Sequence, residues 1–323
     1  MLHVLTLAHL RGLDSAAVDH GSQALATLGW RVLEHDWTQP GLVCDLHAEP
    51  ASPPQSADPT SQLTAADLRP TLDPRLDPLQ VDWAWQPAEG RKKRLLVADM
   101  ESTVIRNEML DELADWVGLR DEVAGITAQA MRGELDFHQA LRRRVALLEG
   151  LAESVLDEAG ERIEIDLGAP RLVATLRRHG VRTVLCSGGF TVYTRRIARQ
   201  LGFDADHANQ LVVRDGHLTG EVVEPILDRG AKVAALERHC AELGIAPTEA
   251  LAVGDGANDL PLLQAVGLGV AFHAKPAVNA AAGFRVRHGD LSTLLAFLGY
   301  RDDEIADPDG IEPEGVDPGG GDR

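Results

Sequence analysis

Two acidic side chains stand where they could carry out group transfer. Asp99 and Glu101 directly follow the apolar run 95–98. A carboxylate in that position can act as a nucleophile, and a second one two residues later can act as general acid and base. Acids after a strand are more often turn or helix-capping residues, so this pair alone leaves both interpretations open.

Two further candidates lie at the ends of other predicted elements. Ser187 and Gly188 follow the predicted strand 181–186. Glycines there allow backbone N–H groups and a hydroxyl to approach an anion, although a Ser-Gly-Gly sequence by itself also fits a structural turn. Lys232 stands at the start of a predicted helix, where a single lysine is usually a solvated surface residue.

The segment 254–259 carries the strongest local signal. Two acids, an amide and two glycines occur within these six residues, directly after the apolar run 250–253. Asp255, Asn258 and Asp259 offer the oxygen ligands that suit a hard cation such as Mg²⁺, which binds through one or two carboxylates plus substrate phosphate. The chain has no glycine-rich loop ending in Gly-Lys-Ser or Gly-Lys-Thr, so a P-loop nucleotide hydrolase is not supported.

The elements that must position these residues alternate from residue 91 onward. Predicted strands at 95–98, 181–186, 250–253 and 269–272 alternate with predicted helices at 170–179, 192–201, 231–243 and 260–266. This order predicts an α/β domain over 91–301, with a parallel sheet covered by helices on both faces. The carboxyl ends of its strands would bring the candidate residues to one edge. The helical stretch at about 106–165 is interpreted as an inserted cap.

The remaining segments have different compositions. Residues 1–48 predict a small α/β module, and the eight prolines between positions 50 and 87 predict that 49–90 is an irregular linker. From 302 to 323 the chain has nine acids, one arginine, three prolines and five glycines. Such a segment buries too little apolar surface to offset its ordering entropy, which predicts a disordered acidic tail.

Overall composition excludes several classes of protein. The 323 residues include 50 acids and 31 bases, and the formal charge of −19 disfavours nucleic acid or anionic lipid as a partner. No apolar run is long enough to span a bilayer, and the N-terminus lacks the pattern of a signal peptide. Three cysteines without metal-ligand spacing favour a reducing compartment. We therefore predict a soluble, cytoplasmic protein; the sequence does not reveal its oligomeric state.

The order of these motifs resembles the haloacid dehalogenase-like phosphatase superfamily, and within it the phosphoserine phosphatase family. The similarity covers about residues 92–298, through the sequences at 99–105, 131–137, 141–145, 187–190, 253–259 and 274–276. It implies a Rossmannoid parallel sheet with a helical cap, and Mg²⁺-dependent hydrolysis of O-phospho-L-serine to L-serine and phosphate, the last step of L-serine biosynthesis. The N-terminal module more faintly resembles a degenerate form of the regulatory, amino-acid-binding extension of some of these enzymes.

The resemblance also implies roles for individual residues. Asp99 would be the nucleophile that forms an aspartyl-phosphate, and Glu101 the general acid and base. Mg²⁺ would be held by Asp99, the main-chain carbonyl of Glu101 and Asp255, with Asp259 orienting these ligands. The residues that would contact the phosphoryl group or lie beside the substrate are Ser187, the Gly188 amide, Lys232 and Asn258.

Substrate choice would lie in the cap. Glu108 matches the family's acid that faces the substrate ammonium, and Arg144 matches the residue that binds the substrate carboxylate. Met131 and Phe137 would close the apolar side. Without the resemblance, Arg144 would be interpreted as part of a solvated basic helix face, because Arg142 and Arg143 adjoin it.

One position departs from the family pattern, which usually has aspartate where this chain has Glu101. The extra methylene adds about 1.5 Å of reach, and a misplacement of about 1 Å can cost on the order of 10²-fold in rate. Glutamate here also resembles a homoserine-kinase-like branch with phosphatase and phosphotransferase activity. Our hypothesis is that Glu101 nevertheless acts as the general acid and base. The alternatives are a phosphotransferase, a phosphatase for another small phosphorylated acid, or a serine-sensing protein with impaired catalysis.

Overall fold

The computed structural model describes residues 2–52, 63–131 and 134–307. Its N-terminal part is a four-stranded antiparallel sheet in the order β2-β3-β1-β4, packed against two helices. The strands are β1 (His3–Ala8), β2 (Trp30–Gln39), β3 (Val43–Pro50) and β4 (Asp82–Pro87), and the helices are α1 (Ser15–Thr27) and α2 (Ala65–Leu76). We call residues 2–87 the N-terminal module.

The prediction of an irregular linker over 49–90 is wrong for its described residues. Strand β3 continues to Pro50, and α2 and β4 complete the N-terminal module. Leu68, Leu72 and Leu76 are spaced to bury one face of α2, while Pro70 and Pro74 lie on its exposed side. The buried leucines therefore outweigh the lost backbone hydrogen bonds. Residues 53–62 of the predicted linker lie outside the described part of the chain.

The second part contains a six-stranded parallel sheet in the order β12-β11-β10-β5-β6-β7. Strand β5, which precedes the candidate nucleophile, lies between β10 and β6. The strands are β5 (Leu95–Ala98), β6 (Arg182–Phe190), β7 (Ala205–Asn209), β10 (Ala250–Gly254), β11 (Leu268–Phe272) and β12 (Phe284–Val286). The predicted parallel α/β fold is confirmed.

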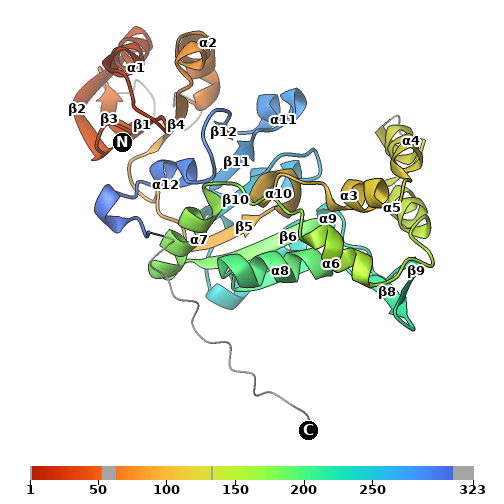
Figure 1. Cartoon of the computed structure of the whole chain (residues 1–323). Coiled ribbons are helices and arrows are strands. Elements are labelled where there is room, and N and C mark those ends of the chain that lie inside the picture. Colours follow the sequence, from red (N-terminus) through yellow and green to blue (C-terminus); the bar gives the residue numbers. More distant parts are fainter. Residues whose placement is uncertain (1, 53–62, 132–133, 308–323) are drawn as a thin grey trace.

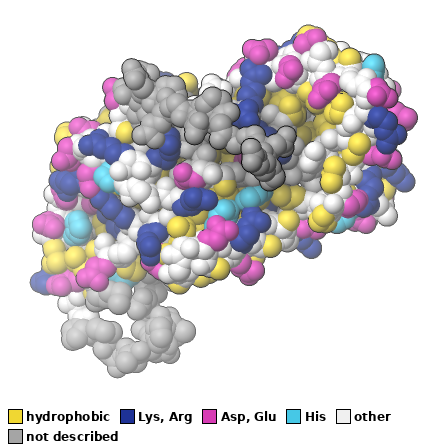
Figure 2. Space-filling view, turned by 90° about the horizontal axis from the view of Figure 1, so that it is seen from below, with side chains coloured by type: hydrophobic (Ala, Val, Ile, Leu, Met, Phe, Trp, Pro, Cys, Tyr) yellow, Lys and Arg dark blue, Asp and Glu magenta, His cyan; other side chains and the backbone are white. Residues whose placement is uncertain are grey.

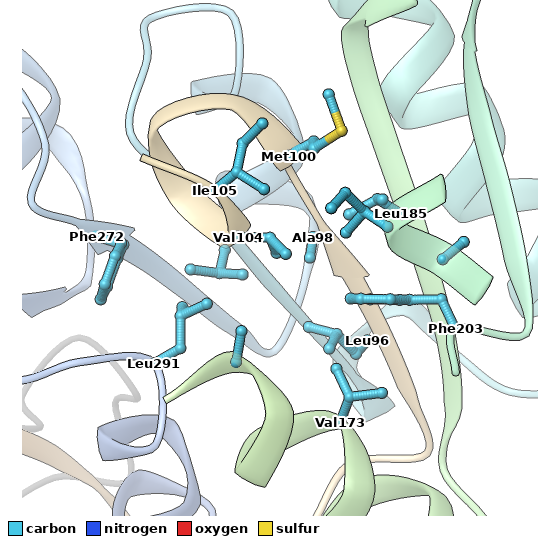
Figure 3. Close-up of a cluster of buried hydrophobic side chains, with 14 of the residues drawn as sticks. Leu96, Ala98, Met100, Val104, Ile105, Val173, Leu185, Phe203, Phe272 and Leu291 are labelled. Carbon is cyan, nitrogen blue, oxygen red and sulfur yellow. The ribbon is translucent and has the colours of Figure 1, made fainter. Parts of the chain in front are cut away.

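Alternate residues of the central strands are buried on opposite faces of the sheet. Leu96 and Ala98 pack in the core formed with α7, α8 and α12, to which Val173 of α7 also belongs (Figure 3). Leu95 and Val97 pack on the other face, against α9, α10 and α11. The helices are α7 (Ala169–Arg178), α8 (Thr191–Leu201), α9 (Arg229–Leu243), α10 (Leu260–Ala265), α11 (Pro276–Ala281) and α12 (Thr293–Phe297).

The stretch between β5 and α7, where the sequence predicts a cap, is mainly helical in its described residues. Its helices are α3 (Met109–Trp116), α4 (Arg120–Met131), α5 (Phe137–Ala146) and α6 (Ser154–Gly160). Helix α5 packs against a hairpin formed by β8 (Leu211–Arg214) and β9 (His217–Val222). Figure 1 shows α3, α4 and α5 at the opposite end of the sheet from the N-terminal module. The cap and the N-terminal module therefore approach the sheet from different sides.

The predicted disordered tail begins too early. Asp302–Glu304 form a short 3-10 turn, Ile305 packs against the main core, and Ala306 is buried with its N–H donating to the Thr175 hydroxyl at 3.0 Å. These apolar contacts hold residues 302–307 against the domain. Residues 308–323 lie outside the described part of the chain.

The surface shows no grouping of one charge on the face drawn in Figure 2, where basic and acidic side chains are interspersed. Cys44, Cys186 and Cys240 are all buried and unpaired. Within the described residues, every helix is too short or too polar to cross a lipid bilayer.

Candidate active site

Asp99 lies directly beyond the end of β5 and is buried. Its N–H donates to the carbonyl of Val253 on β10 at 2.9 Å, which continues the pairing of the two strands. The N–H of Met100 donates to the Asp99 carboxylate at 2.7 Å. Ser102, in the turn that follows, has a φ of +53°. This tight turn places Glu101 next to the same site as Asp99.

Lys232 joins two carboxylates beneath the sheet edge. Its ammonium lies 2.8 Å from Asp99 Oδ2 and donates to Asp259 Oδ1 at 2.6 Å, and its side chain is 1% exposed. Burial acts to lower the pKa of Lys232, but the two carboxylates outweigh it and raise this pKa. Burial raises the pKa of Asp99, and the Lys232 ammonium opposes that shift by stabilising the anion. The pair is therefore suited to hold a carboxylate nucleophile in one orientation.

The loop after β10 adds the remaining acids. Oxygens of Asp99, Asp255 and Asp259 all lie within 4.8 Å of one another. Asp259 is fixed by the N–H of Gly256, which donates to Oδ2 at 3.0 Å. Burial, and then repulsion by Asp259, raises the pKa of Asp255 to about 6. Clustered carboxylates of this kind are costly unless a cation offsets their repulsion, and their oxygens fit a hard divalent cation.

Glu101 points back toward the cap. Its Oε1 accepts a hydrogen bond from the N–H of Met109 at 2.9 Å, at the start of α3. Burial, and then repulsion by Glu108, raises the pKa of Glu101 to about 7. A carboxyl with that pKa can both donate and accept a proton near neutrality.

The predicted site residues meet at a cavity of about 240 Å³ between the sheet edge and the cap. Of the residues singled out from the sequence, the cavity is lined by Asp99, Glu101, Glu108, Phe137, Arg144, Gly188, Asp255 and Asn258. Ser187, Lys232 and Asp259 are fully or almost fully buried next to it. Met131 ends α4, and its side chain lies outside the described part of the structure.

The cap side of the cavity carries an acidic side chain, Glu108, and a basic side chain, Arg144. Ser102 Oγ donates to Glu108 Oε1 at 2.8 Å. The Arg144 guanidinium donates to the carbonyl of Ala140 at 3.3 Å, one turn earlier in α5. Burial lowers the pKa of Arg144, while Asp111 and the two glutamates act in the opposite direction. Arg144 is thus half-buried beside the cavity and does not form the solvated face that its neighbours suggest.

The loop after β6 forms another wall. Gly189 N–H donates to Ser187 Oγ at 2.9 Å, and Asn209 on β7 donates to the carbonyl of Gly188 at 2.8 Å. A Cβ at Gly189 would lie 2.7 Å from a carboxylate oxygen of Glu101. Glycine is therefore needed here for the close approach of backbone to the Glu101 carboxylate.

Sequence reasoning assigned no role to several residues that line the cavity, among them Asp111, Gly189 and Lys275. Gly189 directly follows Ser187 and Gly188, so its place in the same Ser-Gly-Gly sequence could have identified it. Lys275 lies in the Ala-Lys-Pro motif that supports the resemblance, but no role followed from the motif alone. Asp111 has no local signal that separates it from the other acids of α3.

Comparisons with known proteins identify relatives of this chain. Residues 96–264 match the family described as haloacid dehalogenase-like hydrolase. The chain is 46% identical over 215 residues to the phosphoserine phosphatase of Streptomyces coelicolor, covering 67% of this chain and 52% of that protein. The chain thus spans about half the length of that relative, whereas a 43% identical phosphoserine phosphatase of Lactococcus lactis is covered over 98% of its length.

A solved structure gives a matching result. A structure described as a phospho-aspartyl intermediate analogue of phosphoserine phosphatase has a TM-score of 0.60 and 39% identity, covering 64% of this chain and 98% of that chain. The similarity in fold therefore extends over the whole length of that chain.

Proposed function

We propose that this chain, which belongs to the haloacid dehalogenase-like hydrolases and among them to the phosphoserine phosphatases, hydrolyses O-phospho-L-serine to L-serine and phosphate. The observation that carries this proposal is the buried Asp99 carboxylate, which is paired with Lys232 and opens on a cavity that Glu108 and Arg144 also line. The reaction would complete L-serine biosynthesis. The buried, unpaired cysteines favour a cytoplasmic location.

Asp99 is the nucleophile of the proposed mechanism. One of its carboxylate oxygens attacks phosphorus, the ester P–O bond breaks, and the serine oxygen leaves with a proton from Glu101. Water then attacks the phosphorus of the aspartyl-phosphate and gives a proton to Glu101, which releases phosphate and restores Asp99. The N–H of Met100 and the Lys232 ammonium fix the orientation of the carboxylate between these steps.

Glu101 is suited to both proton transfers. Its raised pKa, about 7, leaves a large fraction protonated at neutral pH and ready to donate. The hydrogen bond from Met109 fixes one carboxylate oxygen, and the bare backbone of Gly189 lies against the other side of the group. The longer side chain, compared with the family's usual aspartate, is thus accommodated by a defined pocket.

The phosphoryl group and the amino-acid part bind on opposite sides of the cavity. The Ser187 hydroxyl, the Gly188 N–H and Lys232 stabilise the phosphoryl oxygens as charge develops on them. In the cap, Arg144 binds the substrate carboxylate and Glu108 its ammonium. Asn258 lies beside the substrate, and the apolar residues that close the site are Phe137 and Met131.

A divalent cation, which we propose is Mg²⁺, fits the acidic side of the cavity. Asp99 and Asp255 would hold it together with the Glu101 carbonyl, and Asp259 would orient the ligands while bonded to Lys232. When bound, it would reduce the repulsion between these carboxylates and a dianionic phosphate.

The direct test is release of inorganic phosphate from O-phospho-L-serine by the purified chain with Mg²⁺. Phosphothreonine and phosphoglycolate are compared at equal concentrations, and homoserine is added as an acceptor. Preferential release from phosphoserine supports the proposal. Preference for phosphoglycolate, or transfer of phosphate to homoserine, would assign a different reaction. Serine binding by calorimetry without any turnover would identify a sensor.

Substitution of Glu101 tests its role in proton transfer. We expect Glu101→Gln to lower kcat for phosphoserine about 10²-fold, because an amide cannot donate and then recover the proton. Glu101→Asp should retain more activity than the glutamine variant. Steady-state kinetics of both variants check this prediction, and a glutamine variant with the parent rate would show that Glu101 has no acid–base role.

Removal of divalent cations should abolish most activity. We expect chelation to lower the rate roughly 10²-fold or more, since the repulsion among three clustered carboxylates and the phosphate is then uncompensated. Added Mg²⁺ should restore the rate and also raise the midpoint of thermal unfolding, because it binds only the folded cluster. Full activity in chelator would rule out the cation site.

A further inference from the structure

One basic side chain that lines the cavity, Lys275, has no role in the mechanism above. Five acids line this cavity, and the basic side chains that line it are Arg144 and Lys275. Lys232 lies beneath it, where its charge is shared by Asp99 and Asp259. A dianionic phosphate entering the cavity therefore meets mostly negative charge, and Lys275, which is exposed and lies near Asp255, is placed to offset it.

The segment that carries Lys275 is held by the N-terminal module at one end of α11. Lys275 immediately precedes α11, and the carbonyls at the end of this helix accept hydrogen bonds from Arg69 of α2. The Arg69 guanidinium donates to Ala280 O and Gly283 O, both at 3.2 Å, and to Ala282 O. One side chain of the N-terminal module thus satisfies three carbonyls at the C-terminal end of α11.

The N-terminal module also holds the loop after β12. The buried carboxylate of Asp82 accepts hydrogen bonds from the N–H groups of residues 287–289, at 2.7 Å from Arg287 and Gly289. Gly289 O in turn accepts a hydrogen bond from His273 Nε2 at 2.8 Å. His273 lies two residues before Lys275, so this chain of contacts runs from the module to within two residues of the side chain that lines the cavity.

Ion pairs reinforce the same contact. Arg285 Nη2 lies 2.8 Å from both carboxylate oxygens of Asp73, and Arg287 is bonded to Asp77 at 2.7 Å. The two arginines belong to β12 and the loop after it, and the two acids belong to α2 and the turn that follows. The N-terminal module therefore contacts residues 280–289 directly, and it reaches His273, on the other side of Lys275's helix, through Gly289.

We propose that Lys275 binds the phosphate of the substrate, and that the N-terminal module positions it there, with Arg69 and Asp82 as positioning residues. The inference rests on the proposed function in taking the substrate to be a phosphate monoester. A lysine ammonium binds phosphate as a point charge on a flexible stem, so its contribution depends on where its backbone is fixed. The module would thus complete the catalytic site that lies in the other part of the chain.

The test measures binding of inorganic phosphate by isothermal titration calorimetry in Mg²⁺ buffer, using the full chain. Lys275→Met should weaken phosphate binding about 10-fold, and Lys275→Arg should restore most of it. Arg69→Met should weaken binding several-fold, by about 3-fold or more, because it releases the end of α11. In the double variant, Arg69→Met should add little to the loss from Lys275→Met.

A matched control removes another contact between the two parts of the chain. Arg301 is paired with Asp36 of the N-terminal module at 2.6 Å, away from the 273–289 segment. Arg301→Met should leave the phosphate affinity unchanged. Thermal unfolding of each variant shows whether it is folded, and the exposed position of Lys275 makes its substitution mild.

The outcomes separate this inference from the proposed function. Unchanged phosphate affinity in Lys275→Met would overturn the inference, even if the parent hydrolyses phosphoserine. Additive losses in the double variant, or an equal loss in Arg301→Met, would overturn the positioning role of the module. The expected pattern in a parent that does not hydrolyse phosphoserine would retain the inference and reject the proposed substrate.

Discussion

Asp99→Asn is expected to lower phosphate release from O-phospho-L-serine by at least about 10⁴-fold. The amide has nearly the same shape as the carboxylate, but it lacks the charge that attacks phosphorus. It also weakens the pairing with Lys232. Steady-state assays with Mg²⁺ measure the rate, and intact-mass analysis after rapid acid quenching should find a phosphorylated species in the parent and none in the variant.

A second acid of the same cavity provides the control. Asp111 lines the cavity from α3 and has no part in the proposed displacement. We expect Asp111→Asn to change the rate much less than Asp99→Asn and to preserve the phosphorylated species. Phosphorylation that persists in Asp99→Asn would mean that another residue is the nucleophile.

Lys232→Met should damage both activity and stability. Loss of one preorganised donor to the phosphoryl oxygens typically costs about 10²- to 10³-fold in rate. The substitution also leaves Asp99 and Asp259 buried without their shared ammonium, and breaking a buried pair costs about 3–5 kcal/mol. Kinetics and denaturant unfolding measure the two effects separately.

A second substitution separates the two roles of Lys232. Adding Asp259→Asn to Lys232→Met removes one of the uncompensated buried charges. We expect the double variant to recover part of the lost stability while its turnover stays low. Recovery of turnover together with stability would show that Lys232 acts only by maintaining the fold.

The sequence predicted the phosphatase part of the structure well because its signals are local. Each short apolar run ends at a residue with possible chemistry, and parallel pairing brings Asp99 and Asp255 to one edge. The ion pairs of Lys232 depend on how α9 packs under the sheet, which no spacing in the sequence reveals. The resemblance supplied the role of Arg144, whose neighbours alone suggested a solvated helix face.

The N-terminal module was predicted less well because the number of prolines was given more weight than the periodicity of the apolar residues. Pro70 and Pro74 lie on the exposed side of α2, and the leucines at intervals of four residues carry the information that matters. The contacts of Arg69 and Asp82 join residues more than 200 positions apart. Contacts of that range have no signature in one sequence, so the connection to Lys275 needed the structure.

The strand order β12-β11-β10-β5-β6-β7 has a consequence for how the chain acquires its fold during synthesis. Leu95 of β5 pairs with Ala250 of β10, so the strand that leads into Asp99 lacks one neighbour until most of the protein has been made. Pairings this distant raise contact order and slow folding. All four strands of the N-terminal sheet, by contrast, have been translated by residue 87. A nascent chain released before β10 would therefore carry a formed amino-terminal sheet beside an apolar strand with an open edge, a species prone to aggregate.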